Sequence, residues 1–414
     1  MVLEIRIGNF FSIKDEITLD LRAANIKSQK SKDLKDNIFN INNTDILKTV
    51  AIYGANASGK SNIIKAIRFC NALVLESHLH NENTVYNFKP FKFNSYSNKP
   101  STYFIRFISN SIEFEYSFSL FRTEIISESL YYYPQGRIKK IFTRDERLGK
   151  AKKEKYSFGT LIRRPMDVAE NTSNKTLYIS RASQMDRDIA KEIFNYFNDT
   201  FILGYTNRPI ELLFNKNKNA LLQALKIADS DIVDIKIKKE KQVGKDISFN
   251  LSTNQASVKD SETDALKITT YHKSSPKIAF DFQTEESEGT KKLFAVMLTI
   301  IDIIKNDKIL LIDEIGESLH TNIVEYIISL FNTSTKAQLI FTTHNTKLLN
   351  LSRLRKDQIY FANKNEKAAT DLYSLYDYND FRDTMDAEKA YLQGRFDAIP
   401  FIDDIENLKS ILYE

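Results

Sequence analysis

The sequence lacks several features that would place it in a specialised class of protein. It has one cysteine, Cys70, so no internal disulfide can form, and no group of Cys and His residues has the spacing of a metal site. Its longest apolar stretches are Leu293–Ile304, interrupted by a threonine and an aspartate, and Ile309–Ile312. Neither approaches the about 20 apolar residues of a membrane span. The first residues carry Glu4 and no apolar core, unlike a signal peptide, so we expect a cytoplasmic protein.

The remaining composition is that of an ordinary globular protein. Apolar residues make up 42% and charged residues 27% of the 414 residues, enough chain for two or three domains. Basic residues number 59 against 54 acidic ones, and the net charge of +5 permits DNA binding without predicting it. The stretch 137–155 holds nine basic and three acidic residues. It fits either a phosphate-backbone contact or a solvated loop, and both interpretations remain open.

The N-terminal segment, 1–86, combines strand and helix patterns. We expect a hairpin of Val2–Ile7 and Ile17–Leu21, followed by a polar loop at 24–46. A buried strand at Thr49–Tyr53 and a helix at Asn62–Leu75 are expected next. A β-rich lobe is expected at 87–180, where apolar residues alternate. Its strands are predicted at Tyr103–Ile108, Ile112–Leu120, Glu128–Tyr133 and Arg137–Phe142, with a turn at Pro134-Gln135-Gly136.

Two further segments complete the chain. A helical insertion lobe is placed at 181–284, with short strands at Ile232–Ile237 and Ile247–Leu251 and a polar loop at 252–265. The segment 285–414 alternates helix and strand, which is typical of a parallel sheet. Its elements are expected at Thr290–Ile304, Lys308–Ile312, Thr321–Phe331 and Gln338–Thr342.

A glycine-rich loop carries the first functional motif. Gly54–Ser61 reads Gly-Ala-Asn-Ala-Ser-Gly-Lys-Ser, a complete P-loop (Walker A) pattern between an apolar strand and an amphipathic helix. Its backbone N–H groups and the helix N-terminus suit phosphate binding. Lys60 is expected to reach the β- and γ-phosphates and Ser61 to bind Mg²⁺. The predicted nucleotide contacts are Gly54, Ala55, Asn56, Ala57, Ser58, Gly59, Lys60, Ser61 and Asn62.

Two adjacent carboxylates follow the apolar strand Ile309–Ile312, as at the end of a Walker B strand. Neighbouring residues at a strand end point in different directions. We therefore assign Asp313 to Mg²⁺ and Glu314 to general-base catalysis on the attacking water. His344 ends the next apolar strand, and the carboxyl ends of parallel strands share one rim. His344 is accordingly expected beside the P-loop and Asp313, as a donor to the γ-phosphate or to the water.

The order of these motifs resembles that of ABC-type ATPases. Such proteins carry one further motif, a Ser-Gly loop before a helix, and Glu286-Ser287-Glu288-Gly289-Thr290 lies in the matching place. The resemblance implies that Ser287 and Gly289 contact the γ-phosphate of ATP bound to a second subunit. It also implies that Gly316-Glu317-Ser318-Leu319-His320 crosses the dimer seam. The implied fold is a P-loop ABC-type ATPase head with an inserted antiparallel sheet and a helical lobe.

The wording of the motifs resembles a narrower group. Four stretches, Ile7–Ile13, Ser287–Phe294, Asp313–His320 and Tyr391–Pro400, are similar to stand-alone bacterial AAA/ABC-type ATPases of the RloA and abortive-infection (AbiL-like) group, relatives of RecF, OLD and SMC heads. This resemblance implies an ATP-Mg²⁺-dependent homodimer that controls a separately encoded nuclease-like effector of the Toprim class in defence against phage. A RecF-like DNA-repair ATPase is the alternative. A transporter ATPase is a weaker one, because it needs a membrane partner. The chain has no heptad run or zinc hook, which argues against a chromosome-tethering role.

Overall fold

The computed structural model describes residues 1–93, 95–203, 210–228, 230–250, 255–317, 319–399 and 412, without the side chains of 242–264. The chain forms two compact units. Unit 1 comprises residues 1–204 and 306–414, and unit 2 comprises residues 205–305. This division differs from the four predicted segments, since the segments 1–86 and 87–180 both lie in unit 1 and the helix predicted at 290–304 lies in unit 2.

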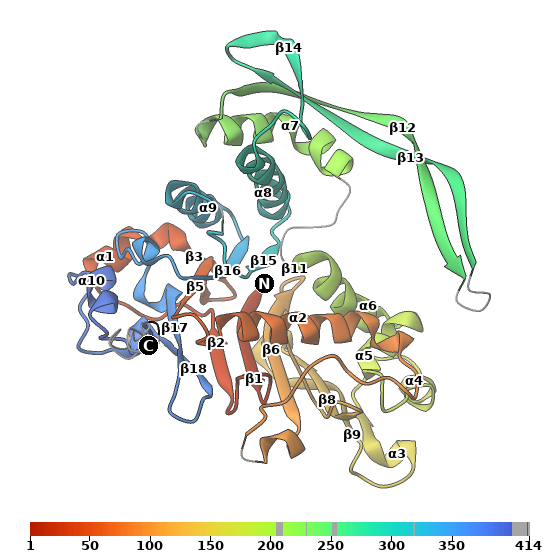
Figure 1. Ribbon diagram of the computed structural model, residues 1–414. Coiled ribbons are helices and arrows are strands. Elements are labelled where there is room, and N and C mark those ends of the chain that lie inside the picture. The colour runs from red at the N-terminus through yellow and green to blue at the C-terminus, as the bar shows by residue number, and fades with distance from the viewer. Residues whose placement is uncertain are drawn as a thin grey trace. The chain divides into compact units, whose positions relative to one another are not determined.

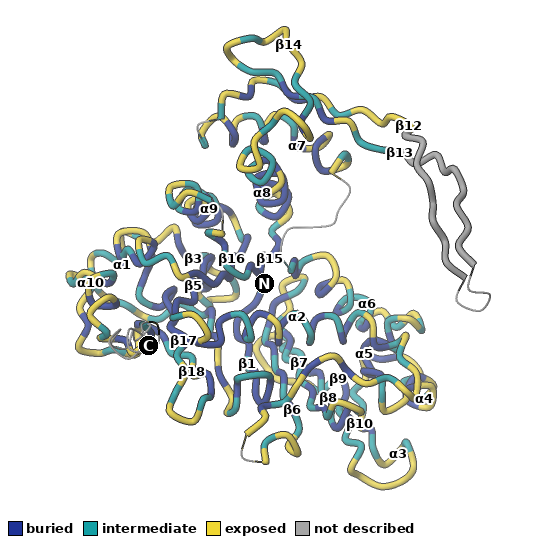
Figure 2. The backbone as a smooth tube through the Cα atoms, in the orientation of Figure 1, coloured by how far each residue is buried: buried dark blue, intermediate teal, exposed yellow. Residues whose placement is uncertain are grey.

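Unit 1 contains a six-stranded, mainly parallel sheet. Its strand order is β11-β15-β16-β5-β17-β18. The strands are β11 (Phe201–Leu203), β15 (Ile309–Ile312), β16 (Gln338–Thr343), β5 (Thr49–Tyr53), β17 (Ile359–Lys364) and β18 (Thr370–Ser374). All neighbouring pairs except β17 and β18 are parallel, which confirms the predicted parallel sheet. Every residue of β5, β15 and β16 is buried, as the dark blue segments in Figure 2 show.

A second, antiparallel sheet of unit 1 joins the N-terminal hairpin to the β-rich segment. Its order is β10-β9-β8-β7-β6-β1-β2. The strands are β1 (Val2–Gly8), β2 (Ile17–Asp20), β6 (Ser101–Ser109), β7 (Ile112–Leu120), β8 (Ile125–Tyr132), β9 (Lys139–Asp145) and β10 (Tyr156–Phe158). The predicted hairpins are confirmed by the pairing of β1 with β2 and of β8 with β9. Because β1 also pairs with β6, the β-rich segment does not stand apart from the N-terminal part.

Helices of unit 1 cover both sheets (Figure 1). The P-loop helix α2 (Lys60–Glu76) places Ile63, Ile67 and Cys70 in one apolar core with residues of both sheets. Burial raises the pKa of the Cys70 thiol, so it acts as a small apolar side chain. The other helices are α1 (Gln29–Asp33), α3 (Lys152–Lys155), α4 (Pro165–Glu170), α5 (Tyr178–Gln184), α6 (Asp188–Asn195), α9 (Thr321–Thr333) and α10 (Ala387–Leu392).

The prediction of a loop at 24–46 is wrong for most of its length. The segment contains α1 and an antiparallel hairpin of β3 (Ile38–Ile41) and β4 (Thr44–Leu47). Asn42 and Asn43, between these strands, have φ angles of 50° and 61°. Asparagine tolerates this left-handed conformation, and two such residues in sequence make the tight turn that suits a hairpin. The polar composition concealed this turn signal.

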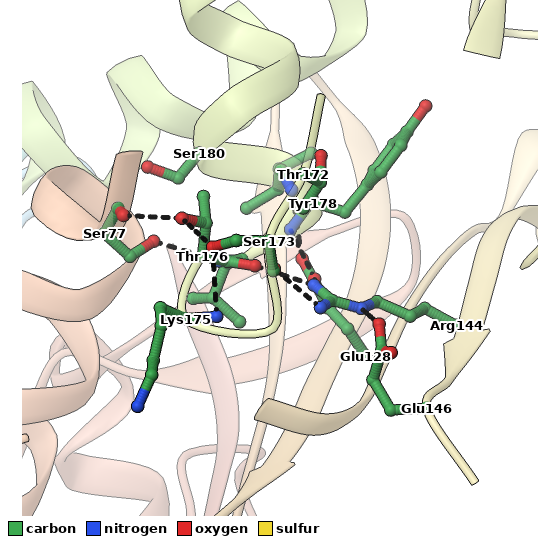
Figure 3. Close-up of polar contacts among 12 residues, drawn as sticks. Ser77, Glu128, Arg144, Glu146, Thr172, Ser173, Lys175, Thr176, Tyr178 and Ser180 are labelled. Carbon is green, nitrogen blue, oxygen red and sulfur yellow. Dashed lines mark hydrogen bonds and ion pairs between the residues drawn. The ribbon is translucent and has the colours of Figure 1, made fainter. Parts of the chain in front are cut away.

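The basic stretch 137–155 is occupied largely by internal contacts. Arg144 of β9 is buried and lies 2.7 Å from Glu146 and 3.6 Å from the buried Glu128 of β8. Its guanidinium also donates to the carbonyl oxygens of Ser173 and Thr176, so it holds the chain between α4 and α5 against the sheet (Figure 3). Lys155 pairs with Glu146 at 2.8 Å. Arg144 and Lys155 are thus held by internal contacts, which neither a solvated loop nor a phosphate-backbone contact predicted.

Unit 2 is a long hairpin with two helices. It comprises α7 (Ile210–Ile227), β12 (Ile232–Asn250), β13 (Gln255–His272), β14 (Ser275–Asp281) and α8 (Glu288–Lys305). The loop predicted at 252–265 is wrong from Gln255 onward, because residues 255–265 belong to β13; residues 251–254 lie outside the described residues. The backbones of β12 and β13 pair from Ile232 opposite His272 to Asn250 opposite Gln255. This pairing forms a strand although the polar composition favours a loop. The helix predicted at Thr290–Ile304 is confirmed as α8.

Within the described residues, every helix is too short or too polar to cross a lipid bilayer.

Candidate functional site

The P-loop of unit 1 connects β5 to α2 under close packing from β17 and β18. Gly59 has a φ of 105°, a region that glycine enters freely and other residues rarely adopt. A Cβ atom at Gly59 would lie 1.9 Å from Thr370 Oγ1, and one at Gly54 would lie 2.4 Å from the Ala362 carbonyl oxygen. The two glycines of the motif are therefore required by contacts behind the loop as well as by its turn.

Three polar side chains hold the loop from behind. Thr370 Oγ1 donates to the Ser58 carbonyl oxygen at 2.9 Å and lies 2.7 Å from Ser12 Oγ. Asn62 Nδ2 donates to the same Ser12 hydroxyl oxygen at 2.7 Å. Asn62 was predicted to contact nucleotide, whereas Ser12 and Thr370 were missed. No sequence pattern reveals them, because the pair is separated by 358 residues and meets only through the fold.

Lys60 is buried and folds back onto its own loop. Its Nζ donates to the carbonyl oxygens of Gly54 at 2.7 Å and Ala55 at 3.0 Å, and lies 3.8 Å from Glu314 Oε1. Burial lowers the pKa of Lys60, and the neighbouring carboxylates oppose that shift. The Ser58 hydroxyl is also buried and has no hydrogen-bond partner among the residues that the structure describes. An ammonium and a hydroxyl at this loop are suitable donors to a phosphate.

Asp313 lies next to the first turn of α2. Its Oδ1 accepts hydrogen bonds from Ser61 Oγ at 3.2 Å and from Thr342 Oγ1 at 2.7 Å. The structure therefore brings together the hydroxyl and the carboxylate that were both assigned to Mg²⁺. Thr342 of β16 was not predicted, although it is two residues before His344 on the same strand end. That spacing places both side chains on one face and could have indicated it.

Glu314 and His344 form the other half of the site. His344 Nδ1 lies 2.9 Å from Glu314 Oε2, and the Glu314 amide donates to Thr342 Oγ1 at 2.8 Å. The Thr342 hydroxyl thus contacts both carboxylate residues, one through its side chain and one through its backbone. Glu314 has a φ of 53°, a conformation that costs about 1–3 kcal/mol outside glycine and is concentrated at functional sites.

These residues fit a nucleotide with a divalent cation. The loop N–H groups, Lys60 and the buried Ser58 hydroxyl match the negative charge of a polyphosphate. Ser61 Oγ and Asp313 supply the few hard oxygen ligands that Mg²⁺ takes from protein when phosphates and water complete its shell. The Glu314–His344 pair lies at the same edge of the sheet, after β15 and β16.

The Ser-Gly loop belongs to unit 2. Ser287 and Gly289 are exposed at the start of α8, and Ser287 Oγ accepts a hydrogen bond from the Thr290 amide at 3.0 Å. The hydroxyl therefore caps the helix N-terminus. Of the predicted seam loop, the Leu319 amide donates to the Gly316 carbonyl oxygen in unit 1, and Ser318 lies outside the described residues. Pro400, the last residue of the stretch Tyr391–Pro400, also lies outside them.

Comparison with known proteins gives one family and a set of remote structures. The family model described as "AAA domain, putative AbiEii toxin, Type IV TA system" matches residues 50–350. No curated protein matches the chain. One similar solved structure is an SMC head bound to the C-terminal winged-helix domain of ScpA, with 14% identity, coverage of 94% of this chain and 99% of that one, and a TM-score of 0.45. Another is the SMC head domain from Thermotoga maritima, with 14% identity, coverages of 90% and 98%, and a TM-score of 0.41.

Proposed function

The chain belongs to the family described as "AAA domain, putative AbiEii toxin, Type IV TA system", and we propose that it binds ATP with Mg²⁺ at the P-loop of unit 1 and hydrolyses it. The observation that carries this proposal is the chain of contacts through Thr342. The Thr342 hydroxyl donates a hydrogen bond to Asp313 and accepts one from the Glu314 amide. Asp313 also accepts a hydrogen bond from the Ser61 hydroxyl. A metal-binding pair and a candidate base are thereby fixed in relation to each other.

The side chains have distinct parts in the proposed reaction. Lys60 exchanges the carbonyl oxygens of Gly54 and Ala55 for phosphate oxygens when nucleotide binds. Ser61 and Asp313 hold Mg²⁺, which when bound neutralises charge on the phosphates. Glu314 takes the proton of the attacking water, and His344 holds that carboxylate by hydrogen bonding to its second oxygen.

We propose further that a second subunit completes the binding site of the ATP held at Lys60. Ser287 and Gly289 present an exposed hydroxyl and a helix N-terminus, which are the donors that suit a phosphate arriving from another chain. A two-fold homodimer then holds two nucleotides, and hydrolysis opens it. Binding and hydrolysis of ATP at this site would accordingly switch the dimer between a closed and an open state.

The output of this switch is proposed to be control of a separately encoded, nuclease-like effector in anti-phage defence. The resemblance of the motifs to abortive-infection ATPases supports this role, and the family description names a putative toxin and a Type IV TA system. The role predicts that the chain alone does not cut DNA. A pull-down with the Glu314→Gln variant and ATP is expected to recover the effector, while metal-dependent DNA cleavage by the purified chain contradicts the role.

Phosphate release by the purified protein tests the hydrolysis. The wild type is expected to release phosphate from ATP, and Glu314→Gln to slow release by about a hundredfold or more while still binding ATP, because the base is lost and the loop is kept. Glu170→Gln, on the exposed end of α4, is the matched control and should keep the wild-type rate. Equal rates for Glu314→Gln and the wild type would contradict the assignment.

A further inference from the structure

An imidazole held between two carboxylates lies at the base of the β12–β13 hairpin in unit 2. His272 is the last residue of β13, and Asp231 immediately precedes β12. His272 Nδ1 lies 2.8 Å from Asp231 Oδ1, and Nε2 lies 2.9 Å from Glu286 Oε1. The Thr270 hydroxyl donates to the same oxygen of Glu286. The side chains of His272 and Glu286 are 15% and 6% exposed, so water screens their contact only in part, whereas the Asp231 side chain is 63% exposed and its contact is screened more.

The two carboxylate contacts favour the doubly protonated form of His272. An ionised carboxylate only accepts hydrogen bonds, so both ring nitrogens must donate, and only the imidazolium has two N–H groups. Burial lowers the pKa of His272, but the hydrogen bonds to Asp231 and Glu286 outweigh it and raise the pKa above its ordinary value. The ring also packs edge-on against Phe280 of β14, at 4.6 Å between centroids. Among the residues that the structure describes, Asp231 and Glu286 are the charged groups paired with the ring.

Glu286 is joined directly to Ser287, the serine of the Ser-Gly loop. On the preceding side the loop is held by Phe282, which is buried against Phe294 of α8. Lys291 donates to the Gln283 carbonyl oxygen at 2.6 Å. Between these contacts and the start of α8, the Glu286 side chain attaches the loop to the hairpin. Through Glu286, the position of Ser287 therefore depends on His272 and Asp231, which lie where β13 ends and β12 begins.

We propose that His272 is a positioning residue that clamps the Ser287 loop to the base of the hairpin by binding Asp231 and Glu286 together. The importance of Ser287 for ATP rests on the proposed function, whereas the clamp itself does not. Through Asp231, which precedes β12, and His272, which ends β13, the clamp connects the loop to both strands of the hairpin.

Hydrogen exchange of the nucleotide-free protein tests the clamp. Amides of the peptide 283–291 should exchange about tenfold to a hundredfold faster in His272→Gln, the range expected for loss of one charge-assisted hydrogen bond. Glu286→Gln should show the same effect and guards against misfolding of the first variant. His80→Gln in unit 1, whose ring lies 3.3 Å from the Lys175 carbonyl oxygen, is the matched control and should leave the peptide unchanged.

A pH series distinguishes the clamp from a merely structural role. Because the folded-state pKa is raised, the protection is present at low pH and lost as pH rises through that pKa. After correction for intrinsic exchange, the wild type should lose protection in 283–291 toward high pH, and His272→Gln should show no such step. Unchanged protection in both variants would overturn the proposal. Absence of ATP hydrolysis in a wild type that shows the pH step would instead contradict only the proposed function.

Discussion

Replacement of Arg144 by methionine should destabilise unit 1 more than any single surface change. The Arg144 and Glu128 side chains are both fully buried, 3.6 Å apart, and Arg144 also reaches Glu146 at 2.7 Å and two carbonyl oxygens (Figure 3). The change leaves the buried Glu128 carboxylate without its guanidinium partner, with hydrogen bonds among the described residues only from the Tyr116 hydroxyl and the Tyr178 and Ile179 amides. Breaking such a pair by removing one partner costs about 3–5 kcal/mol. We expect a loss of that size in the free energy of unfolding.

The same contacts predict two ways in which the stability lost in Arg144→Met is partly regained, namely protonation of Glu128 and its replacement by glutamine. Burial raises the pKa of Glu128 even beside Arg144, which lowers it, so the folded state binds this proton more tightly than the unfolded state. Stability of Arg144→Met therefore increases as pH falls through the raised pKa of Glu128, the direction opposite to that of a salt-bridged acid. The double variant Glu128→Gln/Arg144→Met removes the charge at any pH. It should regain about 1–3 kcal/mol relative to Arg144→Met.

Urea unfolding followed by circular dichroism, with hydrogen exchange of the β8 and β9 peptides to localise the effect, measures these changes. Arg147→Met is the matched control, because Arg147 pairs with Asp145 at an exposed position. It should unfold near the wild-type midpoint. A wild-type midpoint for Arg144→Met, or a double variant less stable than the single one, would refute the reasoning.

Two predictions concern the nucleotide site. Gly59→Ala should abolish binding of a fluorescent ATP analogue, since its Cβ would lie 1.9 Å from Thr370 Oγ1 at a φ of 105°, whereas Gly136→Ala, with open space at its Cβ, should bind normally. Retained binding in Gly59→Ala would contradict the packing argument. Thr342→Val keeps the shape of a buried residue but removes the hydroxyl that contacts Asp313 and the Glu314 amide. Single-turnover hydrolysis should slow roughly tenfold or more, and an unchanged rate would show that the hydroxyl is dispensable.

The sequence predicted the parallel sheet and the rim of the site because both depend on local patterns. Apolar runs identified β5, β15 and β16, and the structure brings motif residues at their ends together: Ser61 contacts Asp313, and His344, expected as a donor to the γ-phosphate or the water, contacts Glu314. Parallel strands that are buried on both faces are easily recognised, since almost every residue is apolar. Adjacency along one rim then follows from the sheet itself.

Features that depend on long-range contacts could not be predicted. Ser12 and Thr370 meet behind the P-loop from opposite ends of the chain. The polar strand β13 exists because its backbone pairs with β12, and its composition alone indicates a loop. Arg144 was counted within a basic stretch, yet its charge is buried against Glu128. In each case the tertiary partner, absent from the local sequence, decides the structure.

Completion of the ATP site by a second subunit is tested most directly by mixing two inactive variants. Lys60→Ala removes the P-loop lysine and Ser287→Ala removes the hydroxyl supplied to the partner, so each homodimer should be inactive. In a mixture, half of the dimers are heterodimers with one intact composite site, and phosphate release should recover to roughly a quarter of the wild-type rate. Release by the mixture that equals the average of the two variants alone would contradict completion in trans.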